Sequence, residues 1–305
     1  MDKDSFETGV EAVVTSFNQG SMILEAVESL CAQTMLPQRI IIMDDGSTEE
    51  NSLSILKAIE KNPNLPIPVN VYYQENSGVS AARNAGIQKA QTSMVLVLDG
   101  DDKLKPEYLE HVSRFLQDSP AMVAASSWME TFGVLDSIVC PDGGKINSFL
   151  ARNCCPATHI LRREAFELCG GYDESMRSGF EDWDYFLSML ETASDAYIGI
   201  VDQPLIQYRT APASSNVKSM DKRLELMRFM IQKHISSYQK YVLDALLGIE
   251  TISDARLYRW EKEAAYAIQN NQGLSKISRD FLKNPTYGDG GMASAVRISS
   301  LSKKQ

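Results

Sequence analysis

The sequence predicts an α/β protein in which helices flank a mostly parallel central sheet, followed by a helical extension at the C-terminus. Three observations predict this fold. Over the first hundred residues, short β-rich runs alternate with amphipathic helical patterns. The β-rich runs are continuously apolar, which is typical of parallel strands that helices cover on both faces. Beyond residue 215 the pattern is almost wholly helical.

The elements follow in a regular order along the chain. In the first hundred residues, strands are predicted at 10–18, 38–47, 69–75 and 93–101, with helices at 21–34, 51–61 and 79–90. The next elements are a helix at 106–118, an apolar run at 121–133, a strand and short helix within 157–174, a helix at 180–194 and closing strands at 196–210. A linker is predicted at 211–219 and a mobile tail at 287–305. The predicted division is therefore a catalytic domain at 1–215 and a helical extension at 216–305.

Composition excludes several classes of protein. Apolar residues make up 44% and charged residues 23% of the 305 residues, and the formal net charge is −10. The acidic balance argues against a nucleic-acid partner, which would favour a basic face. No apolar run approaches the ~20 residues that span a bilayer, and the N-terminus lacks the pattern of a signal peptide. The five cysteines are odd in number, which disfavours a disulfide framework and favours a cytoplasmic location.

Three of the predicted strands end in polar clusters, at Thr15–Asn18, Asp44–Ser47 and Asp99–Asp102. The carboxyl ends of parallel strands meet at one edge of a sheet, and ligands bind beyond that edge. The sequence therefore predicts a binding site formed by these three strand ends.

The sequence "DGDD" at 99–102 is the most acidic of these clusters. Side chains at i and i+2 of an extended segment face the same way, so Asp99 and Asp101 can point together. Two close carboxylates repel each other unless a cation relieves them, and Mg²⁺ or Mn²⁺ prefers oxygen ligands. Such ions also bind substrate phosphates, so the motif predicts a phosphorylated substrate. The alternative is a polar turn, since Asp and Gly are common turn residues.

Other candidate residues carry similar alternatives. Asp45 could hydrogen-bond a base or ribose, or belong to a turn. The helix that follows "ENSG", which ends at Gly78, offers free backbone amides and Arg83 to an anion, although Arg83 could instead pair with a carboxylate.

The segment "GFEDWDYF" at 179–186 adds three more carboxylates. Glu181 and Asp182 begin a helix, where negative charge is favoured whether or not it has a catalytic role. Beside the aromatic Trp183, a carboxylate can have a raised pKa, which suits a general base. Trp183 could also be buried by an amphipathic helix.

Taken together, the segments from "VVTSFNQG" through "MDDGSTEE", "ENSGVSAARNAGI", "VLVLDGDDKLKP" and "GGYDE" to "FEDWDYFL" resemble family 2 glycosyltransferases with the GT-A fold. The resemblance covers about residues 10 to 210. It implies a Rossmann-like nucleotide-binding half and inverting transfer of a sugar from a nucleotide-diphosphate sugar, most often UDP-linked, with Mn²⁺ or Mg²⁺ as cofactor.

The resemblance also implies roles for individual residues. The residues that match the donor-nucleotide positions are Thr15, Phe17, Asn18, Asp45, Gly78, Arg83 and Asp99. Asp101 matches the direct metal ligand, with Asp99 on metal or ribose. Asp182 matches the general base, and Glu181 would support it. Many relatives have a His after "QPLIQYR", whereas this chain has Arg209 followed by Thr210. Arg209 is therefore a candidate to bind the diphosphate or to form an ion pair with a nearby acid. Trp183 is a candidate to contact the acceptor.

Four other classes compete with this interpretation. A nucleotide-sugar pyrophosphorylase needs a Gly-rich basic loop and a dinucleotide oxidoreductase needs GxGxxG, and neither motif is present. A catalytically inactive nucleotide-sugar-binding module and a retaining transferase on the same fold stay open. The resemblance implies a saccharide or lipid-linked saccharide as acceptor. The helical extension could pack on the catalytic domain, form a homodimer or contact the inner face of the cell membrane.

Overall fold

The computed structural model describes residues 7–212, 215–286 and 288–302. The chain divides into two compact units, Met1–Lys240 and Tyr241–Gln305. The sequence analysis placed this boundary earlier, at 215/216.

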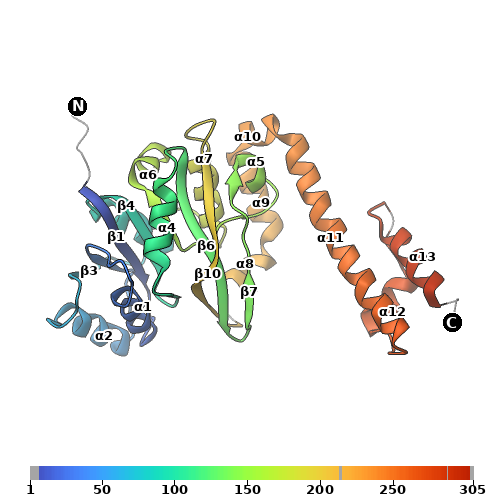
Figure 1. Cartoon of the computed structure of the whole chain (residues 1–305), viewed down its shortest axis with the longest axis horizontal. Helices are drawn as coiled ribbons and strands as arrows, with labels where there is room; N and C mark the ends of the chain where they lie inside the picture. The colour runs from blue at the N-terminus through green and yellow to red at the C-terminus, as the bar shows by residue number, and fades with distance from the viewer. Residues whose placement is uncertain (1–6, 213–214, 287, 303–305) are drawn as a thin grey trace. The chain divides into compact units, whose positions relative to one another are not determined.

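The first unit contains a ten-stranded sheet with the order β3-β2-β1-β4-β9-β6-β10-β5, in which β7 also pairs with β6 and β8 with β10 (Figure 1). The strands are β1 Glu7–Ser16, β2 Ile40–Asp44, β3 Val69–Tyr73, β4 Thr92–Asp99, β5 Lys103–Leu104, β6 Met122–Gly133, β7 Ser137–Val139, β8 Gly144–Lys145, β9 His159–Arg162 and β10 Tyr197–Thr210. Strands β3, β2, β1 and β4 are parallel neighbours, and so are β6 and β10. Strand β9 lies antiparallel between β4 and β6. The predicted α/β class with a central sheet is confirmed.

The helices of this unit are α1 Met22–Cys31, α2 Glu50–Glu60, α3 Val79–Lys89, α4 Tyr108–Gln117, α5 Ile146–Phe149, α6 Arg163–Cys169, α7 Glu181–Leu190, α8 Ser215–Asp221, α9 Arg223–Lys233 and α10 Ile235–Lys240. The first seven helices connect the strands, and α8 lies in the predicted linker. Helix α3 packs closely on the sheet at Gly86, where a Cβ atom would lie 2.3 Å from a side-chain atom of Val13. This glycine lets the helix approach the strands and so brings the start of α3 to the edge of the sheet.

The register of the parallel strands brings the predicted polar clusters together. Thr15 of β1 is paired with Asp99 of β4, and Ser16 of β1 with Asp44 of β2. The three strand ends therefore lie at one edge of the sheet, as the sequence predicts.

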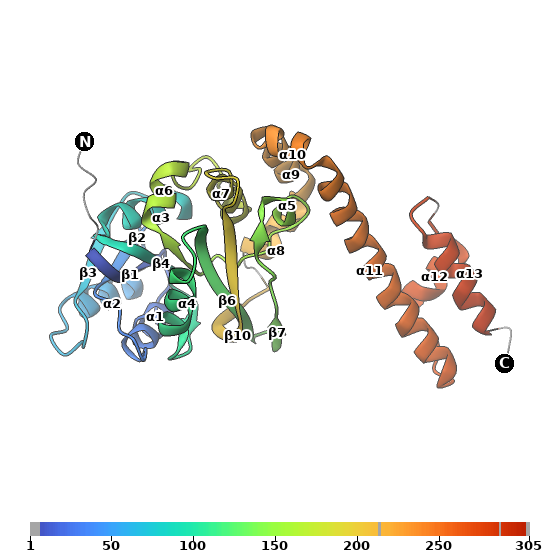
Figure 2. The same ribbon diagram turned by 45° about the horizontal axis from the view of Figure 1, so that its top comes forward.

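The second unit is helical and contains α11 Val242–Gln269, α12 Lys276–Lys283 and α13 Gly291–Ser302 (Figure 2). Helix α13 contacts α11, and Ala295 and Ile298 of α13 are buried. A mobile tail is predicted there, but its part at 291–302 forms this packed helix; residues 287 and 303–305 lie outside the described residues.

Candidate active site

The turn after β4 packs directly against the end of β1. The hydroxyl of Thr15 donates to Oδ1 of Asp99 at 3.0 Å. The amide of Gly100 donates to the carbonyl of Thr15 at 2.9 Å, and a Cβ atom on Gly100 would lie 2.5 Å from that oxygen. Glycine is therefore required here, because any side chain would push the acidic turn away from β1.

Asp102 and Arg209 fix the shape of this turn. Asp102 is 3% exposed, and its Oδ1 accepts the backbone amide of Arg209 at 2.8 Å. Nε of Arg209 donates to the carbonyl of Asp101 at 2.8 Å, and its Nη2 lies 3.0 Å from Oε2 of Glu25. The side chain of Arg209 thus pairs with an acid and with the turn, so the alternative role as a diphosphate ligand is not what its contacts favour.

Asp101, the predicted direct metal ligand, lies near a second carboxylate, that of Asp99. Burial, together with the negative charge of Asp99, raises the pKa of Asp101. Within the described part of the chain, no group of three His, Cys, Asp or Glu residues could hold a metal ion. Mg²⁺ and Mn²⁺ often take one or two protein carboxylates and keep their other positions for water and phosphate oxygens. Asp101 could supply one such carboxylate, whereas both oxygens of Asp99 accept hydrogen bonds from Arg83.

Arg83 connects this turn to the start of α7. Its guanidinium is 2% exposed; Nη2 donates to both carboxylate oxygens of Asp99 at 2.9 Å, and Nη1 donates to Oε1 of Glu181 at 3.1 Å. Arg83 therefore pairs with carboxylates, as one of the two alternatives predicts, and it has two such partners, Asp99 and Glu181. One buried cation brings the "DGDD" and "ED" segments into the same site.

Asp182 lies beside this ion pair with different partners. Helix α7 begins after Phe180, whose backbone is left-handed with a φ of 65°. Oδ1 of Asp182 accepts the amide of Trp183 at 2.8 Å, and Oδ2 accepts Nδ2 of Asn153 at 2.9 Å. Burial, and then the charge of Glu181, raise the pKa of Asp182 to about 7. A carboxylate with such a pKa can both hold and release a proton near neutral pH.

Trp183 does not provide the exposed aromatic surface that one alternative predicts. Only 2% of it is exposed, and its indole N–H donates to the carbonyl of Phe149 at 2.7 Å. The assignment of Trp183 to the acceptor is corrected, because α7 turns this ring into the core.

Phe17, Asn18 and Asp45, which are predicted to bind the donor nucleotide, directly follow the ends of β1 and β2. Asp45 accepts the amide of Gly78 at Oδ2 and the amide of Ser77 at Oδ1, both at 2.8 Å. Oδ1 of Asn18 accepts the backbone amides at 48 and 49, at the start of α2. Asp45 and Asn18 therefore shape the loops of the edge, whereas Phe17 is 46% exposed and free to contact a base.

Comparison with known proteins shows the family of this chain. The family model described as glycosyl transferase family 2 matches residues 11–168, which is more than half of the chain. The chain belongs to this family. It is a glycosyltransferase, and its family assignment confirms the resemblance seen in the sequence.

Known glycosyltransferases and solved structures are similar to this chain over different shares of their length. The uncharacterized glycosyltransferase YwdF of Bacillus subtilis (strain 168) is 26% identical over 74% of this chain and 84% of its own length. The crystal structure of S. aureus TarS 1-349 in complex with UDP-GlcNAc covers 97% of this chain and 91% of that chain, with a TM-score of 0.60 at 15% identity. The structure of GalNAc-T7 with UDP, GalNAc and Mn²⁺ covers 67% of this chain and 44% of that chain, with a TM-score of 0.53 at 16% identity. The likeness of both structures supports the GT-A fold.

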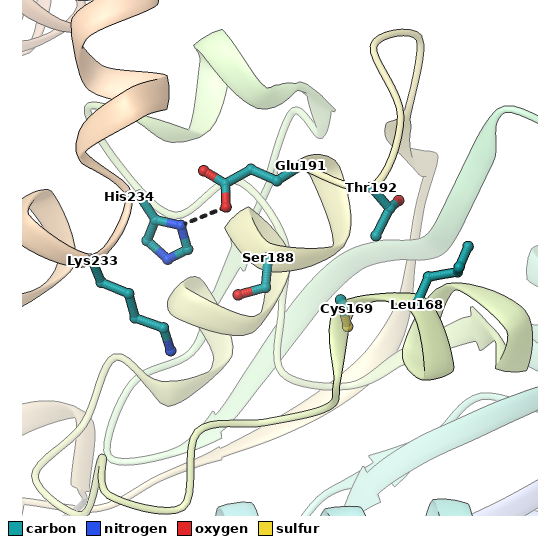
Figure 3. Close-up of a pocket in the computed structure, with 7 residues that line it drawn as sticks. All are labelled: Leu168, Cys169, Ser188, Glu191, Thr192, Lys233 and His234. Atoms are coloured by element: carbon teal, nitrogen blue, oxygen red, sulfur yellow. Dashed lines mark hydrogen bonds and ion pairs between the residues drawn. The ribbon is translucent and has the colours of Figure 1, made fainter.

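A second charged cluster of the glycosyltransferase runs along α7, from Asp184 in its first turn to Glu191 at its C-cap, beside a surface hollow (Figure 3). His234 is 3% exposed; its Nδ1 lies 2.9 Å from Oε2 of Glu191 and its Nε2 lies 3.0 Å from Oδ1 of Asp184. Nζ of Lys233 donates to Oδ2 of Asp184 at 2.8 Å and to Oδ2 of Asp173 at 2.7 Å. These contacts attach α9 to α7.

The sequence analysis missed Asn153 and this cluster. Asp184 is the third carboxylate of "EDWD". Its partners Lys233 and His234, however, lie in the segment that was predicted to form the helical extension at 216–305. No spacing rule places a residue of α9 next to α7.

Across the described residues, no helix is long and apolar enough to cross a membrane.

Proposed function

We propose that this glycosyltransferase is an inverting enzyme of the hexosyltransferase type, which moves a sugar from a UDP-sugar to a hydroxyl group of a saccharide acceptor. The observation that carries the proposal is the bridge from Asp99 through Arg83 to Glu181, at 2.9 and 3.1 Å. It holds the carboxylates that match the family's donor and base motifs in one site, with Asp182 next to Glu181.

Asp182 is the general base of the proposed reaction. It removes the proton of the acceptor hydroxyl, whose oxygen attacks the anomeric carbon from the face opposite the leaving group. The new carbon–oxygen bond forms as the bond to the diphosphate breaks, and UDP leaves with the electron pair. A single displacement of this kind converts an α-linked donor into a β-linked product.

A divalent cation completes the proposal. Asp101 is the proposed direct ligand, and Asp99 contributes to metal or ribose binding. When bound, Mn²⁺ or Mg²⁺ offsets the negative charge that develops on the diphosphate. Support comes from the raised pKa of Asp101 and from the Mn²⁺ named in the GalNAc-T7 structure.

The donor is proposed to be UDP-linked because TarS and GalNAc-T7 were both solved with UDP compounds. Phe17 contacts the base in this proposal, and Thr15, Asp45 and Gly78 shape its pocket. The acceptor is proposed to be a saccharide, free or lipid-linked, at the cytoplasmic face of the membrane, in the synthesis of a cell-surface polysaccharide or glycoconjugate.

A donor panel tests the proposal. UDP release is measured for several UDP-sugars with Mn²⁺, for the wild type, for Asp182→Asn and for Asp195→Asn, which changes an exposed aspartate past the end of α7. We expect Asp182→Asn to lower kcat by about 10²- to 10⁴-fold, the range of general-base catalysis, and Asp195→Asn to match the wild type.

Three results would contradict the mechanism. Full activity of Asp182→Asn would show that Asp182 is not the general base. Turnover that EDTA does not reduce would show that the reaction needs no divalent cation. A product with the donor's anomeric configuration, seen by NMR, indicates a retaining transferase. If the whole panel gives UDP-sugar binding without turnover, the chain is a nucleotide-sugar-binding module.

A further inference from the structure

Asn153 lies in the loop between α5 and β9 and reaches the carboxylate of Asp182. Its Nδ2 donates to Oδ2 of Asp182 at 2.9 Å, and its Oδ1 accepts the amide of Cys155 at 3.2 Å. The second contact fixes the direction of the side-chain amide. Rotating that amide by 180° would place an oxygen against the carboxylate and an NH₂ against an N–H donor, both of which are repulsive.

The loop that carries Asn153 is itself held in place. Cys154 and Cys155 are buried, and the carbonyl of Cys154 accepts the amide of Gly143 at 3.0 Å. Arg152, on the other side of Asn153, is an exposed residue paired with Asp142. The backbone at Asn153 is thus anchored to the adjoining loop, which gives its amide a fixed position beside α7.

The two adjacent carboxylates of the site have partners of different charge. Glu181 is paired with the buried guanidinium of Arg83, whereas the hydrogen bonds that Asp182 receives from described residues come from two neutral groups, Asn153 and the amide of Trp183. A cation beside a carboxylate favours its ionised form strongly and weakens it as a base. A neutral amide can hold a carboxylate in place with a smaller loss of basicity.

We propose that Asn153 is the positioning residue of the general base: its amide holds Oδ2 of Asp182 in one orientation and leaves the remaining lone pairs to the acceptor hydroxyl. The proposal rests on the proposed function, in which Asp182 is that base. A carboxylate has about four lone-pair sites, and Asn153 and Trp183 occupy one on each oxygen. An acceptor can therefore bind either oxygen without displacing Asn153.

The test measures the ionisation of Asp182 directly. Protein labelled with ¹³C at aspartate Cγ is titrated by NMR, and the Asp182 signal is identified by its loss in Asp182→Asn. We expect a midpoint near the pKa of about 7 in the wild type. In Asn153→Ala the carboxylate loses a donor, so we expect the midpoint to rise by about one pH unit. The pH dependence of kcat is measured with whichever UDP-sugar supports turnover. The midpoint of its acidic limb should move to higher pH by the same interval, while KM for that sugar nucleotide stays unchanged.

Two further variants separate positioning from folding. Asn153→Asp keeps the shape and the acceptor for Cys155 but turns an oxygen toward Asp182, so its midpoint should rise further than that of Asn153→Ala. Arg152→Ala changes the neighbouring residue, and its midpoint should equal that of the wild type. Equal midpoints in the wild type, Asn153→Ala and Asn153→Asp would overturn the role of Asn153, even if Asp182→Asn is inactive. Full activity of Asp182→Asn overturns the base itself, so the two failures are distinguishable.

Discussion

At the scale of single residues, the proposed role of Asp182 as general base predicts how activity depends on pH. Burial and the charge of Glu181 raise the pKa of Asp182 to about 7, and a general base must be deprotonated to accept a proton. We therefore expect kcat/KM, which reports ionisation of the free enzyme, to rise with pH below about 7 and to level off above it. The measurement is a pH–rate profile of UDP release between pH 5 and about 9. A flat profile through pH 7 would contradict the role of Asp182.

Single residues also show where sequence reasoning stops. The pairing of Asp99 with Thr15 was predictable, because parallel strands bring their carboxyl ends to one edge. The burial of Trp183 and the partners of Arg209 were each open between two alternatives, since spacing does not tell which face of a helix or strand meets the core. Asn153 had no signal at all, because a hydrogen bond between a loop amide and a distant carboxylate follows only from tertiary packing.

At the scale of elements, ion pairs hold α7 at Glu181 and Asp184 in its first turn and at Glu191, its C-cap. Glu181 pairs with Arg83 of α3 at its start, and Asp184 and Glu191 pair with His234, which lies between α9 and α10. Figure 3 shows His234 pointing toward Glu191 at the end of α7. Because Asp182, the proposed base, lies on this helix, the ion pairs that hold α7 also hold Asp182 in place.

This arrangement predicts a pH dependence of stability. Burial lowers the pKa of His234, but the hydrogen bonds that its ring donates to Asp184 and Glu191 outweigh burial and raise that pKa to about 9 from the 6.5 of an unfolded chain. The charged His234 thus stabilises the fold fully below pH 6.5, and this contribution is lost as the pH rises through about 9. At 1.36 kcal/mol per pKa unit the whole contribution is about 3 kcal/mol. It is measured as the free energy of urea unfolding between those two pH values.

His234→Gln identifies the group responsible. The variant should be less stable than the wild type at pH 6.5 and should lose less stability on going to pH 9. His111→Gln, which replaces a histidine of α4 outside this cluster, should keep the wild-type pH dependence. If His234→Gln and the wild type lose the same free energy over this range, His234 is not the group that titrates.

Element prediction succeeded where the apolar period was long and regular. The alternation of strands and helices up to β4 follows from burial of β1, β2 and β4 beneath helices. Helix α8 was predicted as part of a linker and α13 as part of a mobile tail. Both segments are rich in Ser, Gly or Pro at their borders, which is typical of loops, and only contacts within each unit show that their centres are helical.

At the scale of the whole molecule, the boundary between the two units is the largest difference from the sequence analysis. The division at 215/216 followed the change from a mixed to a helical pattern. The structure instead keeps α9 and α10 with the sheet, and the second unit begins at Tyr241. Composition marks where helices begin, but it does not show which core they pack against. Met230 is fully buried, and the hydroxyl of Tyr238 donates to the carbonyl of Leu150 at 3.0 Å.

These contacts predict different outcomes for two truncations. A chain that ends at Lys240 keeps every residue of the candidate site together with Lys233 and His234, so we expect it to fold and to bind UDP like the full chain. A chain that ends at Ser215 loses both partners and leaves Asp184, which is 1% exposed, without its cations. Removing the partner of a buried charge costs about 3–5 kcal/mol, so this shorter chain should unfold at a much lower temperature.

The comparison is made by following circular dichroism on heating, with UDP binding measured by calorimetry in the presence of Mn²⁺. Asp184→Asn in the chain that ends at Lys240 is the matched variant, because it removes the buried charge while α9 stays in place. Part of the loss seen at Ser215 should reappear in that variant, and the remainder reflects the apolar surface around Met230 that α9 covers. Equal melting temperatures for the chains that end at Ser215 and Lys240 would show that α9 and α10 add nothing to the sheet-containing unit.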